Sequence, residues 1–159
     1  MKRLKTFSSR ETEKLGEKTA EGILSLKPAR AARVLALTGE LGSGKTTFVK
    51  GFFKGLRAKE KVSSPTFIMI RRTPLGCGRY KNVFHADLYR LKSAKELIPL
   101  GLKNEFKNPQ NIVLVEWAEK AKAHLPAGAK RIYFRHGKSE NERVISMNPV
   151  RSRDRSVIN

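Results

Sequence analysis

The residues best suited to chemistry lie in a glycine-rich segment, Gly39-Glu-Leu-Gly-Ser-Gly44-Lys45-Thr46. A loop of this kind leaves its backbone N–H groups free to converge on a phosphate chain, while Lys45 brings a positive charge to the terminal phosphates. The hydroxyl of Thr46 can contact Mg²⁺. The sequence therefore predicts a P-loop that binds a nucleotide. The predicted nucleotide-binding residues of this segment are Glu40, Leu41, Gly42, Ser43, Gly44, Lys45, Thr46 and Thr47.

The segments on either side of the loop match the context that a P-loop requires. The apolar run 34–38 predicts a buried strand before the loop, and the residues from Thr46 onward predict a helix. The apolar residues of this helix recur at helical spacing and are Phe48, Val49, Phe52, Phe53 and Leu56. A helix that begins here points its positive N-terminus at the bound anion.

Two acidic residues end apolar runs, as an acid that organises Mg²⁺ and water would. Asp87 follows Val-Phe-His-Ala, and Glu116 follows Ile-Val-Leu-Val. Both are expected at carboxyl ends of strands, where ligands of open α/β sheets collect. Spacing alone leaves open which carboxylate touches the metal and which orients water. Asp87 has a second interpretation, as the cap of a helix that begins at Leu88.

Three further side chains have a chemical and a structural interpretation each. Thr66 follows the predicted helix, and is either a switch residue that senses the terminal phosphate or an ordinary hydroxyl at a strand start. His85 could be a base, but its alternation with Phe84 favours a packed or hydrogen-bonded histidine. Trp117 follows Glu116 directly, so it lies either at the lip of the phosphate site or in the core.

The remaining pattern predicts the elements that must position these residues. A helix over 10–26 begins at a capping box formed by Ser8 and Glu11. The other predicted elements are a hairpin of 67–72 and 80–86 around a turn at 73–78, two short helices within 93–106, a strand over 111–117, a short helix over 118–124, and closing strands over 130–135 and 142–147. We therefore expect one α/β domain over 1–150, a P-loop NTPase-like three-layer sandwich with a mixed parallel and antiparallel sheet, followed by a disordered basic tail over 151–159.

The composition adds a strong positive charge. There are 34 Lys and Arg against 14 Asp and Glu, a formal net charge of +20. This charge favours contact with a polyanion such as RNA, DNA or an acidic protein, or else reflects a solvated basic surface. The single cysteine, Cys77, fits a reducing compartment, and no apolar stretch predicts a signal peptide or a membrane span. We expect a soluble, cytoplasmic protein with no membrane partner.

Four motifs in chain order resemble the TsaE (YjeE) family of small bacterial P-loop ATPases. They are Gly39-Glu-Leu-Gly-Ser-Gly-Lys-Thr-Thr47, Ser64-Pro-Thr-Phe67, His85-Ala-Asp-Leu-Tyr-Arg90 and Leu114-Val-Glu-Trp117. The resemblance covers residues 5 to 147 and implies ATP and ADP as nucleotides, with Mg²⁺. It also implies a role in threonylcarbamoylation of adenosine 37 of tRNAs that read ANN codons. The implied partners are TsaB and TsaD, whose complex the ATPase cycle resets between turnovers.

The resemblance also implies roles for individual residues. Lys45 and Thr46 would hold phosphate and Mg²⁺, with Glu116 as the second metal ligand. Asp87 would be needed for hydrolysis, and Thr66 would match the switch threonine. Three more positions concern the nucleotide: Trp117 beside the site, Arg143 as a basic residue that approaches it, and the helix start near Ser9 as a flank of the adenine.

The leading hypothesis is therefore a Mg²⁺-dependent ATPase that regulates a tRNA-modifying complex. One alternative is a small-molecule kinase, although the chain has no evident Arg-rich lid. The other is a basic RNA-binding module in which nucleotide is only structural. The net positive charge is high for the TsaE family that the chain resembles. Whether the chain also contacts tRNA directly is therefore an open question.

Overall fold

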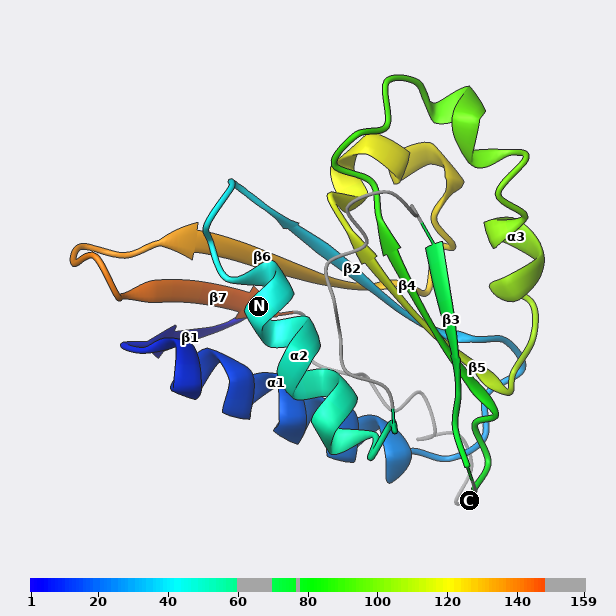
Figure 1. Cartoon of the computed structure of the whole chain (residues 1–159), viewed down its shortest axis with the longest axis horizontal. Helices are drawn as coiled ribbons and strands as arrows, with labels where there is room; N and C mark the ends of the chain where they lie inside the picture. The colour runs from blue at the N-terminus through cyan, green and yellow to red at the C-terminus, as the bar shows by residue number, and fades with distance from the viewer. Residues whose placement is uncertain (60–69, 77, 148–159) are drawn as a thin grey trace, which may run out of the picture.

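The computed structural model describes residues 1–59, 70–76 and 78–147, and it is built around a seven-stranded sheet of order β1-β7-β6-β2-β5-β4-β3 (Figure 1). The strands are β1 (Lys2–Thr6), β2 (Arg33–Gly39), β3 (Ile70–Pro74), β4 (Asn82–Asp87), β5 (Asn111–Glu116), β6 (Lys130–His136) and β7 (Arg143–Met147). The helices are α1 (Ser9–Leu24), α2 (Lys45–Gly55) and α3 (Leu102–Glu105), with 3-10 helices η1 (Ala94–Leu97) and η2 (Ala118–His124).

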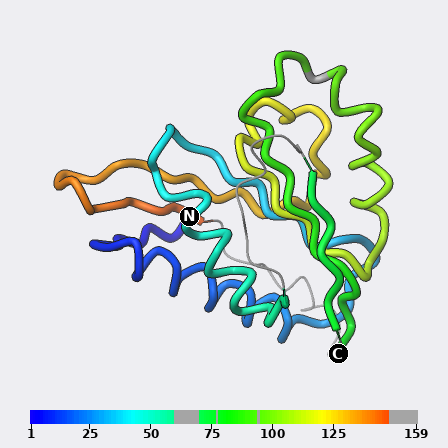
Figure 2. Tube along the Cα trace, viewed as in Figure 1, coloured from blue at the N-terminus to red at the C-terminus, as the bar shows by residue number. Residues whose placement is uncertain are grey.

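The strand directions confirm the predicted mixed sheet. β2 pairs in parallel with β5 on one side and β6 on the other, and β4 pairs in parallel with β5. The strands nearer the two edges are antiparallel, since β7 pairs with β6 and β1, and β3 pairs with β4. The trace in Figure 2 runs from the α1–β2 connection at one end of the sheet to the loop before α2 at the other. The carboxyl ends of β2, β4 and β5 therefore meet at the loop end.

Helices pack on both faces of the sheet and bury two apolar clusters. One face of β2, carrying Leu35 and Leu37, packs beneath α1 and α2 with Phe48 and Phe52. The other face, carrying Val34 and Ala36, packs beneath η1, α3 and η2. This alternation along one strand gives the three layers expected from the sequence.

Glycines bring α1 and α2 into direct backbone contact. A Cβ added at Gly51 would lie 1.8 Å from the carbonyl oxygen of Glu13, and one at Gly16 would lie 2.1 Å from that of Phe48. No side chain fits at either position, so the two helices pack as closely as their backbones allow.

Two details differ from the sequence expectation. The strand β1 was not predicted, because among its residues only Thr6 is buried and its partner β7 lies at the far end of the chain. The hairpin turn was predicted to begin at Thr73, but β3 continues through Pro74. An edge strand tolerates proline, because the missing N–H faces outward rather than into a ladder.

The predicted capping box of α1 forms with one change of partner. The N–H of Glu11 donates to Ser8 Oγ at 3.1 Å, as expected, but the Glu11 carboxylate accepts from the N–H of Phe7 at 2.8 Å rather than from that of Ser8. Thr66, Cys77 and the tail over 151–159 lie outside the described residues. Within the described ranges, no helix has the length and apolar composition needed to cross a bilayer.

Candidate functional site

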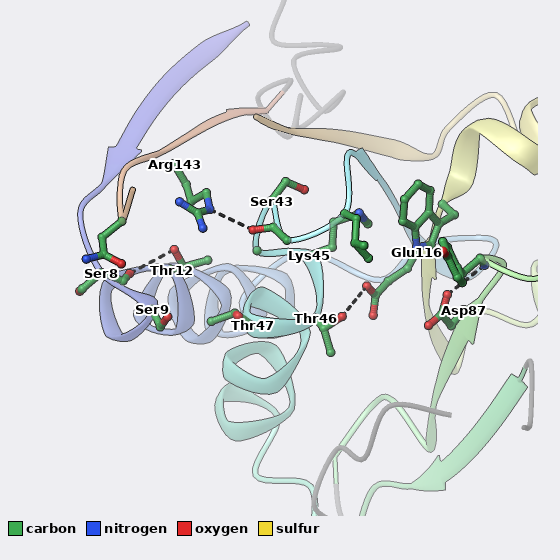
Figure 3. Close-up of a pocket in the computed structure, with 16 residues that line it drawn as sticks. Ser8, Ser9, Thr12, Ser43, Lys45, Thr46, Thr47, Asp87, Glu116 and Arg143 are labelled. Atoms are coloured by element: carbon green, nitrogen blue, oxygen red, sulfur yellow. Dashed lines mark hydrogen bonds between the residues drawn. The ribbon is translucent and has the colours of Figure 1, made fainter. Parts of the chain in front are cut away.

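A cavity of about 330 Å³ lies at the carboxyl ends of β2, β4 and β5, between the P-loop and the start of α1 (Figure 3). The residues that line it are Ser8, Ser9, Thr12, Leu41, Gly42, Ser43, Gly44, Lys45, Thr46, Thr47, Asp87, Tyr89, Glu116, Trp117, Asn141 and Arg143. The structure thus brings the predicted loop residues, both predicted acids, Trp117 and Arg143 around one space. Glu40 is the exception, because its side chain is exposed and only its carbonyl takes part.

The loop backbone has a conformation that requires glycine. Gly44, at the N-cap of α2, has φ 98° in the left-handed region. Gly39 has φ 151°, and a Cβ there would lie 2.3 Å from the carbonyl oxygen of Phe134 on β6. Both glycines allow the chain to leave β2, turn and enter α2 with its first N–H groups facing the cavity.

Lys45 is 5% exposed although it carries a charge. Its Nζ donates to the carbonyl oxygens of Gly39 at 2.6 Å and Glu40 at 2.8 Å, and lies 3.9 Å from the ring centroid of Trp117. Burial lowers the pKa of Lys45, an effect opposed by the negative charges of Glu116, Glu119 and Asp87. The ammonium is thus held by uncharged groups in a dry position, where an anionic phosphate would be a stronger partner.

Glu116 joins three elements through its carboxylate, which is buried with 1% exposure. Its Oε2 accepts from the Thr46 hydroxyl at 2.9 Å, and its Oε1 lies 2.8 Å from His85 Nε2. Because an ionised carboxylate can only accept, His85 donates from Nε2. His85 is therefore a buried, hydrogen-bonded histidine, the interpretation that the sequence favoured, and it orients the acid.

Asp87 lies directly beside Glu116, since the two residues are partners in the parallel pairing of β4 with β5. Its Oδ1 accepts from the N–H of Tyr89 at 3.0 Å. This contact caps a turn, and the next helical segment, η1, begins only at Ala94. The interpretation of Asp87 as the cap of a helix at Leu88 is therefore wrong. Both carboxylates remain at one cavity wall.

The oxygen groups at this wall suit a Mg²⁺ ion. Thr46 offers a hydroxyl, Glu116 and Asp87 offer carboxylates, and hard oxygen donors are what Mg²⁺ prefers. Among the described residues no group of three or more His, Cys, Asp or Glu could enclose a metal. A hydroxyl and two carboxylates are donors that Mg²⁺ could use, since it usually takes one or two protein carboxylates and completes its shell with phosphate and water.

Trp117 satisfies both interpretations made from the sequence. It lines the cavity beside Lys45, and its half-buried ring also packs against the apolar cluster beneath η2. Its backbone has φ 56° and ψ 41°, a left-handed conformation that is costly for a bulky residue. The ring lies beside Tyr89, whose ring centroid is 5.0 Å away.

Two side chains from β6 and β7 donate hydrogen bonds to carbonyl groups of the loop. Arg143 Nε donates to the carbonyl oxygen of Gly42 at 3.1 Å, and His136 Nε2 donates to that of Leu41 at 3.0 Å. Arg143 Nη1 also donates to the carbonyl of Glu140 at 2.6 Å. Arg143 therefore lies on the cavity wall, with its guanidinium engaged by the loop.

Sequence reasoning missed several wall residues. Thr12 accompanies Ser8 and Ser9 at the start of α1, and its hydroxyl lies 2.7 Å from that of Thr6. Tyr89 and Asn141 come from connections, and His136 reaches the loop only through strand pairing. The capping box at Ser8 marked the start of α1, but no local signal relates Asn141 or His136 to the P-loop.

The chain is similar to known proteins along most of its length. The family model described as "Threonylcarbamoyl adenosine biosynthesis protein TsaE" matches residues 6–145. The chain is 36% identical over 155 residues to the tRNA threonylcarbamoyladenosine biosynthesis protein TsaE of Bacillus subtilis, covering 96% of this chain and 90% of the relative. It is 37% identical over 113 residues to the protein of that name from Haemophilus influenzae, covering 71% and 68%.

The fold is also similar to that of a solved structure. The crystal structure of YdiB from Bacillus subtilis superimposes with a TM-score of 0.68 at 32% identity, over 92% of this chain and 83% of that one. Similarity of fold is thus found together with sequence similarity over most of the chain. The chain belongs to the TsaE family of tRNA threonylcarbamoyladenosine biosynthesis proteins.

Proposed function

We propose that this chain is a cytoplasmic, Mg²⁺-dependent ATPase whose cycle resets a complex of TsaB- and TsaD-like proteins during threonylcarbamoylation of adenosine 37 in tRNAs that read ANN codons. The observation that carries the proposal is the meeting of Lys45, Thr46 and Glu116 at one cavity wall, with Asp87 beside Glu116. Membership in a family of tRNA threonylcarbamoyladenosine biosynthesis supports the pathway. The choice of ATP, TsaB and TsaD follows from the family resemblance.

The loop and Lys45 would bind the phosphates. The loop N–H groups and the N-terminus of α2 face the cavity, and the Lys45 ammonium can leave the carbonyls of Gly39 and Glu40 for a phosphate oxygen. Arg143 and His136 would keep the loop in shape by donating to its carbonyl oxygens. Trp117 and the start of α1, with Ser8 and Ser9, would bound the remainder of the nucleotide.

Thr46, Glu116 and Asp87 would bind the metal ion and position the attacking water. Thr46 and Glu116, already 2.9 Å apart, are the proposed metal ligands, and bound Mg²⁺ would neutralise charge on the β- and γ-phosphates. His85 holds Glu116 in orientation from behind. Asp87 uses Oδ1 for the Tyr89 N–H, and within the described residues Oδ2 has no protein partner, so it can accept a proton or hydrogen bond from the attacking water. Thr66, the proposed switch residue, lies outside the described residues.

The proposal is tested by separating nucleotide binding from turnover. Lys45→Ala should weaken ATP binding roughly 30-fold or more, because a buried charge pair with phosphate is lost. Glu116→Gln and Asp87→Asn should bind ATP within a few-fold of wild type and lower turnover roughly 100-fold. Isothermal titration and phosphate release at saturating Mg²⁺ give both quantities. Lys50→Ala, which removes an exposed lysine from the same helix, is the control.

The regulatory part needs the partners. Adding TsaB- and TsaD-like proteins should raise ATP turnover of the wild-type chain, and a strain without this chain should lose the tRNA modification. Normal ATP binding with turnover that partners never change, together with intact tRNA modification in that strain, would contradict the proposal. Phosphorylation of a small hydroxyl compound in place of phosphate release would indicate a kinase instead.

A further inference from the structure

One face of the sheet is apolar over half its width and basic over the other half. On the side away from α1 and α2, the outward residues of β2 and β5 include Val34, Ala36 and Val115, which the short helices bury. The cluster beneath those helices contains no residue of β1, β7 or β6. In Figure 1 α3 lies beside β4 and β5, on the opposite side of the molecule from β1 and β7.

Strand alternation identifies the residues on the second half of this face. Ile132, Phe134, Ile145 and Met147 point into the core under α1 and α2, so their neighbours in sequence point the other way. Pairing aligns Arg3, Ser146 and Tyr133 in one row and Lys5, Val144 and Arg135 in the next. Arg131 continues β6 beyond these rows. The basic face is therefore Arg3, Lys5, Arg131, Tyr133, Arg135, Val144 and Ser146.

The basic face carries four cations and no carboxylate among its described residues. Arg3, Lys5 and Arg135 are exposed, while Arg131 and Tyr133 are half-buried. Lys5 is compensated, since its Nζ lies 2.8 Å from Glu142 Oε1 at the edge of the face. Within the described part of the chain, the three guanidinium groups have no ion-pair partner. Three arginines thus surround a tyrosine on a part of the sheet that the apolar cluster beneath the short helices does not reach.

This arrangement matches the chemistry of RNA binding. Arginine binds phosphate through two parallel N–H groups, and a tyrosine ring on a sheet can stack an unpaired base. Alternate residues along β6 are roughly 6.6 Å apart and adjacent strands roughly 4.8 Å, so the face has room for a few nucleotides. None of its residues lines the nucleotide cavity.

We propose that the basic face of β1, β7 and β6 binds the phosphodiester backbone of tRNA, with Tyr133 stacking on an unpaired base. The inference rests on the tRNA pathway in the proposed function and not on ATP hydrolysis. Binding of RNA and binding of nucleotide would then use separate parts of the molecule. The net charge of +20 supplies long-range attraction, and the three arginines supply the site.

The test is a salt series of tRNA binding measured by fluorescence anisotropy with the full chain and unmodified tRNA. Arg3→Gln/Arg131→Gln/Arg135→Gln should weaken binding roughly 100-fold or more at low salt. It should also reduce the slope of log affinity against log salt by about 2, as expected for the loss of three phosphate contacts. Tyr133→Leu should weaken binding roughly five-fold or more with an unchanged slope, because stacking is not ionic.

The matched control is Lys14→Gln/Lys18→Gln/Lys50→Gln, which removes the same charge from exposed positions on α1 and α2. Equal weakening by both triple variants would show that net charge alone attracts RNA, and would overturn the proposal. If the triple variant of Arg3, Arg131 and Arg135 kept its tRNA binding and lost binding to TsaB or TsaD, the basic face would be a protein interface. That result would also overturn the proposal.

Two further measurements keep the result interpretable. The triple variant of Arg3, Arg131 and Arg135 should bind ATP as wild type does, which would show that it folds. If its ATP binding is weaker, the salt slope is measured instead on the single variant Arg135→Gln, at an exposed position. Lys45→Ala should retain tRNA binding. Loss of tRNA binding in Lys45→Ala would place RNA in the nucleotide cavity and contradict the basic face, whereas an inactive ATPase with normal tRNA binding would count only against the proposed function.

Discussion

At the scale of single residues, the His85–Glu116 pair decides how the carboxylate is presented. Both side chains are 1% exposed, and the 2.8 Å contact leaves Glu116 Oε2 for Thr46. A buried carboxylate that loses a donor keeps its desolvation cost without compensation. His85 therefore supports the site from a position that substrate does not reach.

His85→Ala should lower the free energy of unfolding by roughly 2–4 kcal/mol, because it leaves a buried charge with one donor fewer and opens space beside Phe53. His85→Gln retains an N–H donor and should recover part of this loss, together with Mg²⁺-dependent ATP affinity. Urea unfolding and titration of ATP with and without Mg²⁺ provide the measurements. Equal effects of both variants would show that packing, and not the hydrogen bond, is what His85 supplies.

The residues of the candidate site differ in how far the sequence could predict them. The P-loop is predictable because its chemistry is local, with glycines, Lys45 and Thr46 in one short segment. Asp87 and Glu116 were recognisable as ends of apolar runs, but their pairing in adjacent strands depends on register, which spacing does not specify. Asn141 reaches the cavity, and His136 reaches the P-loop, only through the order of strands.

At the scale of elements, the contact between α1 and α2 fixes the start of α1 relative to the P-loop. Gly51→Ala should destabilise the fold by roughly 2–3 kcal/mol, because the new methyl group meets the Glu13 carbonyl and the helices must separate. Gly22→Ala in α1 is the control, since a Cβ there meets nothing within 4 Å. It should stabilise by about 0.5–1 kcal/mol through helix propensity. Chemical denaturation that shows equal effects would contradict the close packing.

A carboxylate also fastens β1 to the connection between β6 and β7. Glu142 accepts hydrogen bonds from Lys5 Nζ and from the N–H of Lys138, and these contacts hold the pKa of Glu142 below its ordinary value of 4.5. A carboxylate whose pKa is lower in the native state than in the unfolded state stabilises the fold at any pH above the unfolded-state pKa. This contribution is lost as the pH falls through the native-state pKa.

Glu142→Gln should therefore melt at lower temperature than wild type near neutral pH, and the difference should shrink as pH falls below 4.5 toward the native pKa. Thermal melts across this range measure the difference. Lys5→Gln should reproduce part of it, because Lys138 still donates to the carboxylate. A difference that grew on acidification would mean that folding raises the pKa of Glu142 and does not lower it.

Element types were easier to predict than their pairings. Apolar periodicity identified α1, α2, β2 and β5, because each buries a continuous face. It did not identify β1, whose residues are mostly exposed and whose partner β7 lies more than a hundred positions later in the chain. The order of the strands was likewise outside the reach of local pattern.

At the scale of the whole molecule, the charge of +20 acts on stability as well as on binding. Like charges repel in the compact state, and salt screens them over a Debye length of about 10 Å at 0.1 M. Raising NaCl from roughly 20 mM to 300 mM should therefore raise the melting temperature, while tRNA affinity falls. Scanning calorimetry measures the first effect. A falling melting temperature would mean that specific ion pairs outweigh the general repulsion.

The strand order has a consequence for how the protein is made. β2 pairs with β5 and β6, which begin at Asn111 and Lys130, while β1 pairs with β7, which begins at Arg143. Synthesis proceeds from the N-terminus, so the strand that leads into the P-loop leaves the ribosome early and waits for both neighbours. The sheet can close only after β7, the last of its strands in the chain, has been synthesised. Until then the apolar strand β2 is a segment on which chaperones can act.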